Sequence, residues 1–219
     1  MLEVKSVFVI NLVERPDRLT HMKNEFKDKS EFKVEFIRSR RNKVGALGLW
    51  KNIVKIITKA QKSDKEYVII CEDDHQFTKE YSAKKLDNYI LEGKRKNADV
   101  LLAGVSWFKD AVQISANLFW IDKFSGLQFT VIYRKFFDLI LAADFGAKDA
   151  ADYKISELAQ DIFLIFPYLS TQKEFGYSDA TPKNNSSGRV AGIFDNSAER
   201  LECLDRVRSF YALNNSQSG

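Results

Sequence analysis

The stretch YVIICEDDH, residues 67–75, joins a run of apolar side chains directly to three consecutive acids. An uninterrupted apolar run of this length is typical of a strand that is buried on both faces, as in a parallel sheet. In open α/β sheets, ligands bind outside the carboxyl ends of the strands. The stretch therefore predicts a central strand over Tyr67–Cys71 that delivers Glu72, Asp73 and Asp74 to a ligand-binding edge.

Further apolar runs alternate with segments of helical periodicity on both sides of this strand. Strands are expected over Val7–Leu12, Lys33–Arg38, Asp99–Val105, Asn117–Asp122 and Leu127–Tyr133, with another apolar run at Ile162–Phe166. Helices are expected over Arg15–Lys27, Gly45–Lys62, Ala83–Lys96, Phe136–Ala143, Ile155–Leu158 and Arg200–Tyr211. This order predicts an α/β fold with a mixed sheet flanked by helices, more antiparallel in its second half.

The composition is that of a globular protein. The 219 residues carry a net charge of +4, which favours an anionic ligand or weak contact with an anionic membrane surface over nucleic acid. No apolar run approaches the roughly 20 residues that span a bilayer, and the N-terminus lacks the pattern of a signal peptide. We therefore expect a cytoplasmic protein, with the inner face of the membrane as an alternative location, and reduced thiols at Cys71 and Cys203.

Adjacent carboxylates repel one another, and a divalent cation removes this cost because hard cations prefer oxygen ligands. Alternation along the chain lets Glu72 and Asp74 point the same way and hold Mn²⁺ or Mg²⁺, while Asp73 points elsewhere. Such an ion would bind the diphosphate of a nucleotide sugar and act as a Lewis acid on the leaving group. The competing interpretation is a solvated acidic turn. His75 is either a further ligand or, as we favour, a neutral hydrogen-bonded imidazole.

Four stretches together resemble a known enzyme family. They are Val9–Leu12 with Arg15–Arg18, Gly45–Gly48, Ile70–Asp74 and the late segment Pro167–Asp179. In order and separation they are similar to the family 25 glycosyltransferases, which include lipopolysaccharide and collagen galactosyltransferases. The chain departs from the family at Leu49–Ile53, where a Leu-Ser-His sequence is usual.

The resemblance implies a GT-A-type, Rossmann-like fold in one domain, residues 1–219. Its nucleotide-binding part would span about residues 1–105 and its acceptor-binding part about residues 106–213. It also implies a UDP-sugar donor, manganese, and transfer of a hexose, galactose among the candidates, to a glycan or lipopolysaccharide with inversion. The alternative is an inactive relative that binds a nucleotide or glycan without turnover.

The resemblance also suggests roles for individual residues. Donor contacts are expected from Asn11, Leu12, Arg15, Glu72, Asp73 and Gln172, with Ser178 and Asp179 in the same late segment. Asp161, which precedes an apolar run, is the expected general base, and Glu157 competes for that role. Either acid is otherwise a helix-end charge.

Two further groups have open interpretations. The basic loop of Arg38, Arg40, Arg41 and Lys43 either attracts an anionic ligand or is a solvated charge run. Trp107, Phe108 and Trp120 either stack on a sugar or pack in the core, which we favour.

Overall fold

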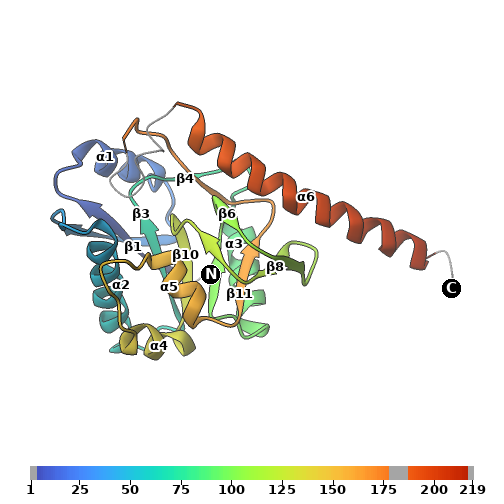
Figure 1. Cartoon of the computed structure of the whole chain (residues 1–219), viewed down its shortest axis with the longest axis horizontal. Helices are drawn as coiled ribbons and strands as arrows, with labels where there is room; N and C mark the ends of the chain where they lie inside the picture. The colour runs from blue at the N-terminus through green and yellow to red at the C-terminus, as the bar shows by residue number, and fades with distance from the viewer. Residues whose placement is uncertain (1–3, 178–186, 217–219) are drawn as a thin grey trace.

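A computed structural model describes residues 4–177 and 187–216, with side chains described as far as residue 211 (Figure 1). The strands are β1 (Lys5–Leu12), β2 (Phe32–Ser39), β3 (Tyr67–Glu72), β4 (His75–Phe77), β5 (Val100–Leu102), β6 (Trp107–Phe108), β7 (Ala111–Gln113), β8 (Leu118–Ile121), β9 (Phe124–Ser125), β10 (Phe129–Tyr133), β11 (Ile162–Ile165) and β12 (Ser170–Gln172). The helices are α1 (Pro16–Glu25), α2 (Gly45–Gln61), α3 (Ala83–Arg95), η1 (Arg134–Phe136), α4 (Phe137–Ala142), α5 (Ala151–Leu158) and α6 (Arg189–Ser216).

One eight-stranded sheet has the order β2-β1-β3-β10-β5-β11-β8-β7. Strand β1 is parallel to both β2 and β3, and β11 is parallel to β5. Strand β10 lies between β3 and β5 and is antiparallel to both, so β3 and β5 run in the same direction. The carboxyl ends of β1, β2, β3, β5 and β11 therefore meet at one edge of the sheet.

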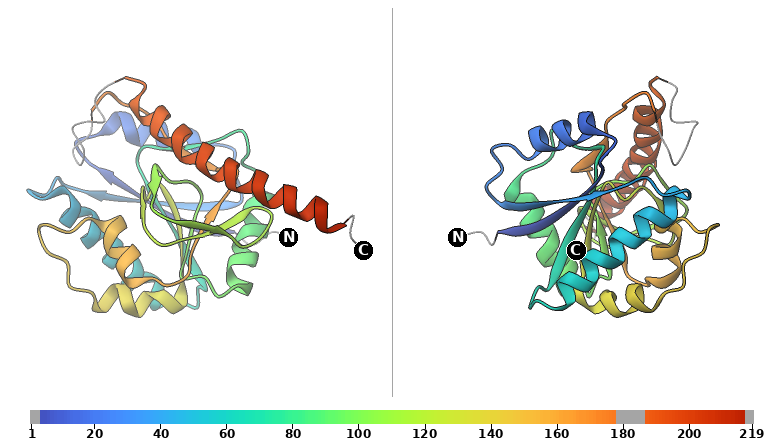
Figure 2. Two further views of the ribbon diagram at one scale, coloured as in Figure 1. Left: turned by 45° about the vertical axis from the view of Figure 1, so that its right-hand side comes forward. Right: turned by 90° about the vertical axis from the view of Figure 1, so that its left-hand side faces the viewer.

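Helices cover both faces of this sheet. On one face, Met22 of α1 and Ile90 of α3 pack with the inward side chains of β1, β3 and β10. On the other face, the apolar sides of α2, α4, α5 and α6 pack around strand residues such as Ile70 and Leu102. Figure 2 shows α1 and α3 on the side of the sheet opposite α2, α4 and α5. The α/β class with a mixed, helix-flanked sheet is confirmed.

Local sequence explains where several helices begin. Pro16 occupies the first turn of α1, where its missing N–H and fixed φ cost nothing. The Ser82 hydroxyl caps α3 by accepting a hydrogen bond from the Lys85 backbone N–H. Among the described residues, no helix combines the length and apolar character that crossing a bilayer requires.

The structure differs from the sequence-based prediction in two helix starts and in several short strands. Helix α5 begins at Ala151, before the predicted start at Ile155. Helix α6 begins at Arg189 rather than Arg200. The short antiparallel pair of β4 and β12 was not predicted, and it places the segment after Pro167 beside the acidic turn.

Candidate functional site

A cavity of about 780 Å³ opens at the sheet edge where the parallel strands end. Leu12, Ser39 and Glu72, the last residues of β1, β2 and β3, all line it. The loop before β10 and the first turn of α5 form the facing wall through Gly126 and Asp152. The acidic triplet therefore lies at the ligand-binding edge of the sheet, as its position after an apolar strand indicated.

Two of the three acids are already paired with arginine. Nη1 of Arg18 lies 2.9 Å from Oδ1 of Asp73 and 3.1 Å from Oδ2 of Asp74. Asp73 also accepts a hydrogen bond from Nδ2 of Asn11 at 3.0 Å, and Nη1 of Arg15 lies 3.8 Å from its Oδ1. We expected Asp73 to point away from Asp74. Instead, both carboxylates contact the same guanidinium.

Arg18 is held from its other side by the segment that follows β12. Its Nη2 donates to the backbone oxygen of Tyr177 at 3.0 Å, and its guanidinium lies over the rings of Phe175 and Tyr177. Burial alone would lower the pKa of Arg18, but the carboxylates of Asp74 and Asp73 raise it above its ordinary value. Arg18 is thus a fixed positive charge at the base of the cavity.

The ionised forms of Glu72 and Asp74 are disfavoured at this site. Burial, and then the neighbouring charges of Asp74, Asp152 and Asp73, raise the pKa of Glu72 well above its ordinary value. Burial also raises the pKa of Asp74 to about 6, although Arg18 opposes the shift. The Oδ1 atom of Asp74 is buried and has no hydrogen-bond partner among the described residues.

These acids fit a divalent cation. A cation beside Glu72 and Asp74 would satisfy the orphaned Oδ1 atom and offset the burial and the charge repulsion that raise both pKa values. Within the described ranges, no group of three or more His, Cys, Asp or Glu side chains forms a ready metal cage. Mg²⁺ and similar hard ions are commonly bound by one or two carboxylates, and water and substrate phosphates complete their shell.

Asp152 is the functional candidate that the sequence analysis missed. It lies in the first turn of α5 and lines the cavity, and its Oδ2 accepts a hydrogen bond from the Gly126 backbone N–H at 3.2 Å. Its charge contributes to the raised pKa of Glu72, so the two acids are near neighbours. An acid in the first turn of a helix is a recognisable signal, but α5 was predicted to start after it.

The predicted general base and its competitor lie elsewhere. Asp161 precedes β11, so it belongs to the sheet edge opposite the cavity, and its Oδ2 lies 3.3 Å from Nζ of Lys135. Glu157 is exposed and pairs with Lys154 at 3.0 Å. Neither acid lines the cavity, so the structure does not place them where a general base for this site would lie. Asp161 precedes its strand, whereas the acidic triplet follows its own strand. The two therefore lie at opposite edges of the sheet.

The remaining predicted donor contacts gather at the cavity. Leu12, Arg15 and Gln172 line it, and buried Asn11 supports it from behind through its hydrogen bonds to Asp73 and to the Arg15 backbone oxygen. Ser178 and Asp179 lie outside the described residues.

The side chains with open interpretations fall into three groups. Arg40, Arg41 and Lys43 form a basic rim on the cavity, which favours ligand attraction over a merely solvated loop. His75 is buried with its Nδ1 2.7 Å from the Ser170 hydroxyl, and burial lowers its pKa, so it is a neutral imidazole. The proposed stacking aromatics Trp107, Phe108 and Trp120 do not line the cavity; Phe108 packs in the core.

No protein-family model matches the chain, and no curated protein sequence matches it. Among solved structures, an apo UDP-glucose pyrophosphorylase has a TM-score of 0.45 at 9% identity, covering 90% of this chain and 81% of that one. A UDP-glucose pyrophosphorylase complexed with UDP-glucose has a TM-score of 0.44 at 10% identity, covering 90% and 81%. HddC from Yersinia pseudotuberculosis has a TM-score of 0.41 at 10% identity, covering 90% and 79%. At these scores, function is inferred from the residues of the site alone.

Proposed function

We propose that this chain is a glycosyltransferase that moves a hexose, galactose among the candidates, from a UDP-sugar to a glycan or lipopolysaccharide acceptor. The observation that carries the proposal is the pairing of opposite charges in one cavity. Glu72 and Asp74 line it, and Oδ1 of Asp74 is buried without a hydrogen-bond partner among the described residues, while Arg15, Arg18 and the basic rim supply positive charge. A cation-bound diphosphate needs carboxylates for the cation and positive groups for the phosphates, and a sugar nucleotide carries such a diphosphate.

Glu72 and Asp74 are the residues that would hold Mn²⁺ or Mg²⁺. When bound, such an ion stabilises the negative charge that grows on the leaving diphosphate as the glycosidic bond breaks. Arg18 fixes the direction of the Asp74 carboxylate through the contact between its Nη1 and Oδ2 of Asp74. Arg15, beside Asp73 at the cavity wall, is positioned to contact the nucleotide.

Asp152 is the proposed general base. In an inverting transfer, the acceptor hydroxyl attacks the anomeric carbon on the face opposite the leaving group, and a carboxylate takes the hydroxyl proton. Asp152 lines the wall of the cavity formed by α5, across from the carboxyl end of β1, and Gly126 fixes one of its oxygens. The other oxygen accepts from the backbone N–H of Tyr153 at 2.9 Å, which keeps the carboxylate oriented.

The test uses the full chain with UDP and Mn²⁺, followed by assays of UDP-galactose and UDP-glucose hydrolysis. We expect UDP with Mn²⁺ to raise the unfolding temperature more than either does alone, and slow hydrolysis of at least one sugar nucleotide. Stabilisation without hydrolysis would replace this proposal with the non-catalytic nucleotide-binding alternative. An unfolding temperature indifferent to UDP with Mn²⁺ would overturn both.

A matched pair of variants separates the metal-dependent response from general charge effects. Glu72→Gln is expected to remove the Mn²⁺-dependent part of the stabilisation, because it removes one of the two proposed ligands. Glu66→Gln removes an equal charge at an exposed position outside the cavity and should leave the response intact. Equal responses of the two variants would exclude Glu72 as a ligand.

A further inference from the structure

The amino-terminal part of helix α6 is anchored to the body. Val190, Phe194 and Leu201 are buried in the core beneath it. The guanidinium of Arg200 donates to the backbone oxygens of Phe108 at 2.6 Å and Lys109 at 2.8 Å, and this contact clamps the helix to β6. The carboxyl-terminal end of the helix projects past the globular body (Figures 1 and 2).

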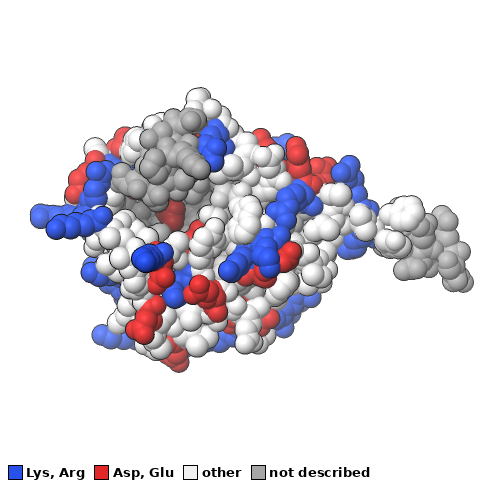
Figure 3. All heavy atoms as spheres, viewed as in Figure 1, with Lys and Arg blue, Asp and Glu red and all other residues white. Residues whose placement is uncertain are grey.

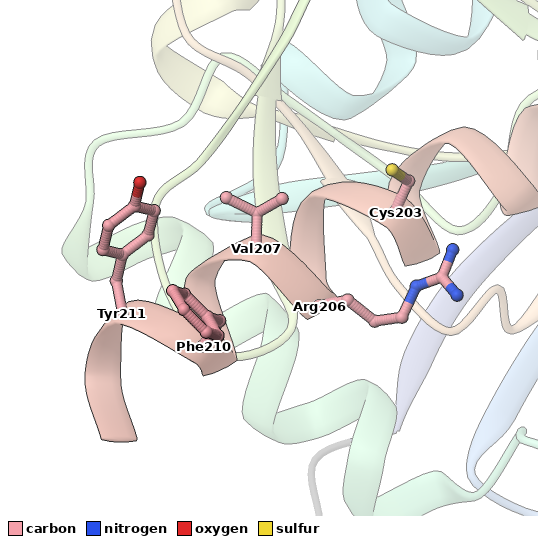
Figure 4. A pocket seen from close by; sticks show the side chains of 5 residues that line it. All are labelled: Cys203, Arg206, Val207, Phe210 and Tyr211. Carbon is pink, nitrogen blue, oxygen red and sulfur yellow. The ribbon is translucent and has the colours of Figure 1, made fainter. Parts of the chain in front are cut away.

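The carboxyl-terminal part of α6 exposes large apolar side chains. The exposed fractions are 37% for Leu204, 50% for Val207, 61% for Phe210 and 62% for Tyr211. Their spacing of three, four and seven residues places them on one side of a helix, where they form an apolar stripe with Cys203. Figure 4 shows the side chains of Cys203, Val207, Phe210 and Tyr211 projecting from this part of α6, where they line a hollow together with Arg206.

The apolar stripe faces away from the body. Asp205 points inward, where its Oδ1 accepts a hydrogen bond from Nε2 of Gln113 at 2.7 Å. At about 100° per residue, Asp205 lies roughly 160° around the helix from Val207, the middle of the stripe. The stripe therefore has no partner among the described residues of this chain.

Charge is distributed around the stripe in a definite pattern. Arg206 and Arg208 lie about 100° to either side of Val207 and so flank the stripe, while Glu202 and Asp205 lie on the far side of the helix. Both arginines are exposed. In Figure 3, basic side chains lie where α6 leaves the body, followed by uncharged atoms toward its end.

We propose that the projecting end of α6 binds the surface of an anionic lipid bilayer. Apolar side chains flanked by arginines on one face, with acids on the other, suit a helix that lies in the bilayer interface with its apolar face down. Phe210 and Tyr211 would insert at the headgroup level, and Arg206 and Arg208 would reach the lipid phosphates on either side. If two copies of the chain paired through the stripe, their flanking arginines would lie together at the edge of the interface, where like charges repel.

Co-flotation of the full chain with vesicles tests this proposal. Binding is expected to vesicles of phosphatidylcholine mixed with phosphatidylglycerol, and to be about tenfold weaker to phosphatidylcholine alone. The double variant Val207→Ser with Phe210→Ser should lose binding, and Arg206→Gln with Arg208→Gln should weaken it about tenfold for the anionic vesicles only. All four side chains are exposed, and the ion pair of Arg208 with Asp205 at 3.6 Å lies at the surface, so the unfolding temperature should change little.

Two control variants match these changes in chemistry. Leu139→Ser removes an exposed apolar side chain on α4, and Lys51→Gln with Lys55→Gln removes two exposed charges on α2. Both should bind vesicles like the unmodified chain. Equal loss in the controls, or no flotation of the unmodified chain, would overturn the proposal. A dimer in sedimentation that Phe210→Ser abolishes, without vesicle binding, would assign the stripe to a second copy instead.

Discussion

Arg18 decides how three adjacent acids are tolerated. The sequence suggested a bound cation or a solvated turn, but the structure supplies a buried guanidinium that contacts both Asp73 and Asp74. This pairing could not be anticipated from the sequence, because Arg18 and Asp73 are 55 positions apart and belong to different elements. The described contacts of Arg18 are to Asp73 and Asp74 and not to Glu72, so the case for a cation now rests on Glu72 and on Oδ1 of Asp74.

Replacing Arg18 should therefore destabilise the protein strongly. Arg18→Gln removes the shared cationic partner of the buried Asp73 and the partly buried Asp74, at a cost of about 3 kcal/mol, or about 6–12 °C in unfolding temperature. Thermal unfolding measures this, with Lys43→Gln as a control that removes an exposed charge from the same cavity. Adding Asp73→Asn should recover part of the loss, and a double variant no more stable than Arg18→Gln would contradict the pairing.

Asp152 should affect turnover and not binding. Asp152→Asn keeps the size of the side chain but removes the proton acceptor, so sugar-nucleotide turnover should fall about 100-fold or more. Stabilisation by UDP with Mn²⁺ should persist, because the proposed ligands are unchanged. Asp161→Asn tests the earlier assignment and should leave turnover intact, since Asp161 lies at the opposite sheet edge. The reverse pattern of activities would restore Asp161 as the base.

The turn before β10 positions Asp152, and its glycine has a structural reason. Gly126 has a φ of +112°, a conformation that side-chain-bearing residues rarely adopt, and a Cβ there would approach Oε1 of Gln128 at 2.8 Å. Gly126→Ala should cost about 1–3 kcal/mol of unfolding free energy. It should also reduce turnover by shifting the N–H that orients Asp152.

Gly192→Ala is the matched control for this turn. Gly192 lies within α6, and nothing stands within 4 Å of a Cβ built there. The same substitution should therefore stabilise the protein by about 0.5–1 kcal/mol. Urea unfolding compares the two variants, and a destabilised Gly192→Ala alongside an unaffected Gly126→Ala would contradict both assignments.

Most elements of the sheet could be predicted from apolar runs, because a strand buried on both faces leaves a continuous pattern. The chemistry of the site was harder to predict. Helix α5 begins with Ala151 and Asp152, before its apolar periodicity becomes visible, so its first turn and its acid were missed. Asp161 was misplaced because sequence alone does not give the direction of β11, and direction decides which sheet edge an acid reaches.

The cavity draws on segments from across the chain, and this arrangement concentrates charge at one edge of the sheet. The acidic triplet follows β3, the basic rim follows β2, and Asp152 comes from α5 in the second half. Low-dielectric walls around a charged cleft focus its field and raise the local concentration of oppositely charged ligands. The weakly basic balance of the whole molecule is consistent with attraction of an anionic ligand, but the rim fixes where that attraction acts.

Removing the rim charges should weaken nucleotide binding through this field. Arg40→Gln with Lys43→Gln should raise the Kd for UDP in the presence of Mn²⁺ about tenfold, or about 1.4 kcal/mol. Titration calorimetry at rising salt should show affinity falling in the unmodified chain and falling less steeply in the variant, because salt screens the exposed charges that the variant lacks. Lys51→Gln with Lys55→Gln removes the same charge from α2 outside the cavity and should keep the steeper salt dependence. If both double variants shifted the affinity equally, the effect would belong to net charge, and the rim would be the solvated loop of the competing interpretation.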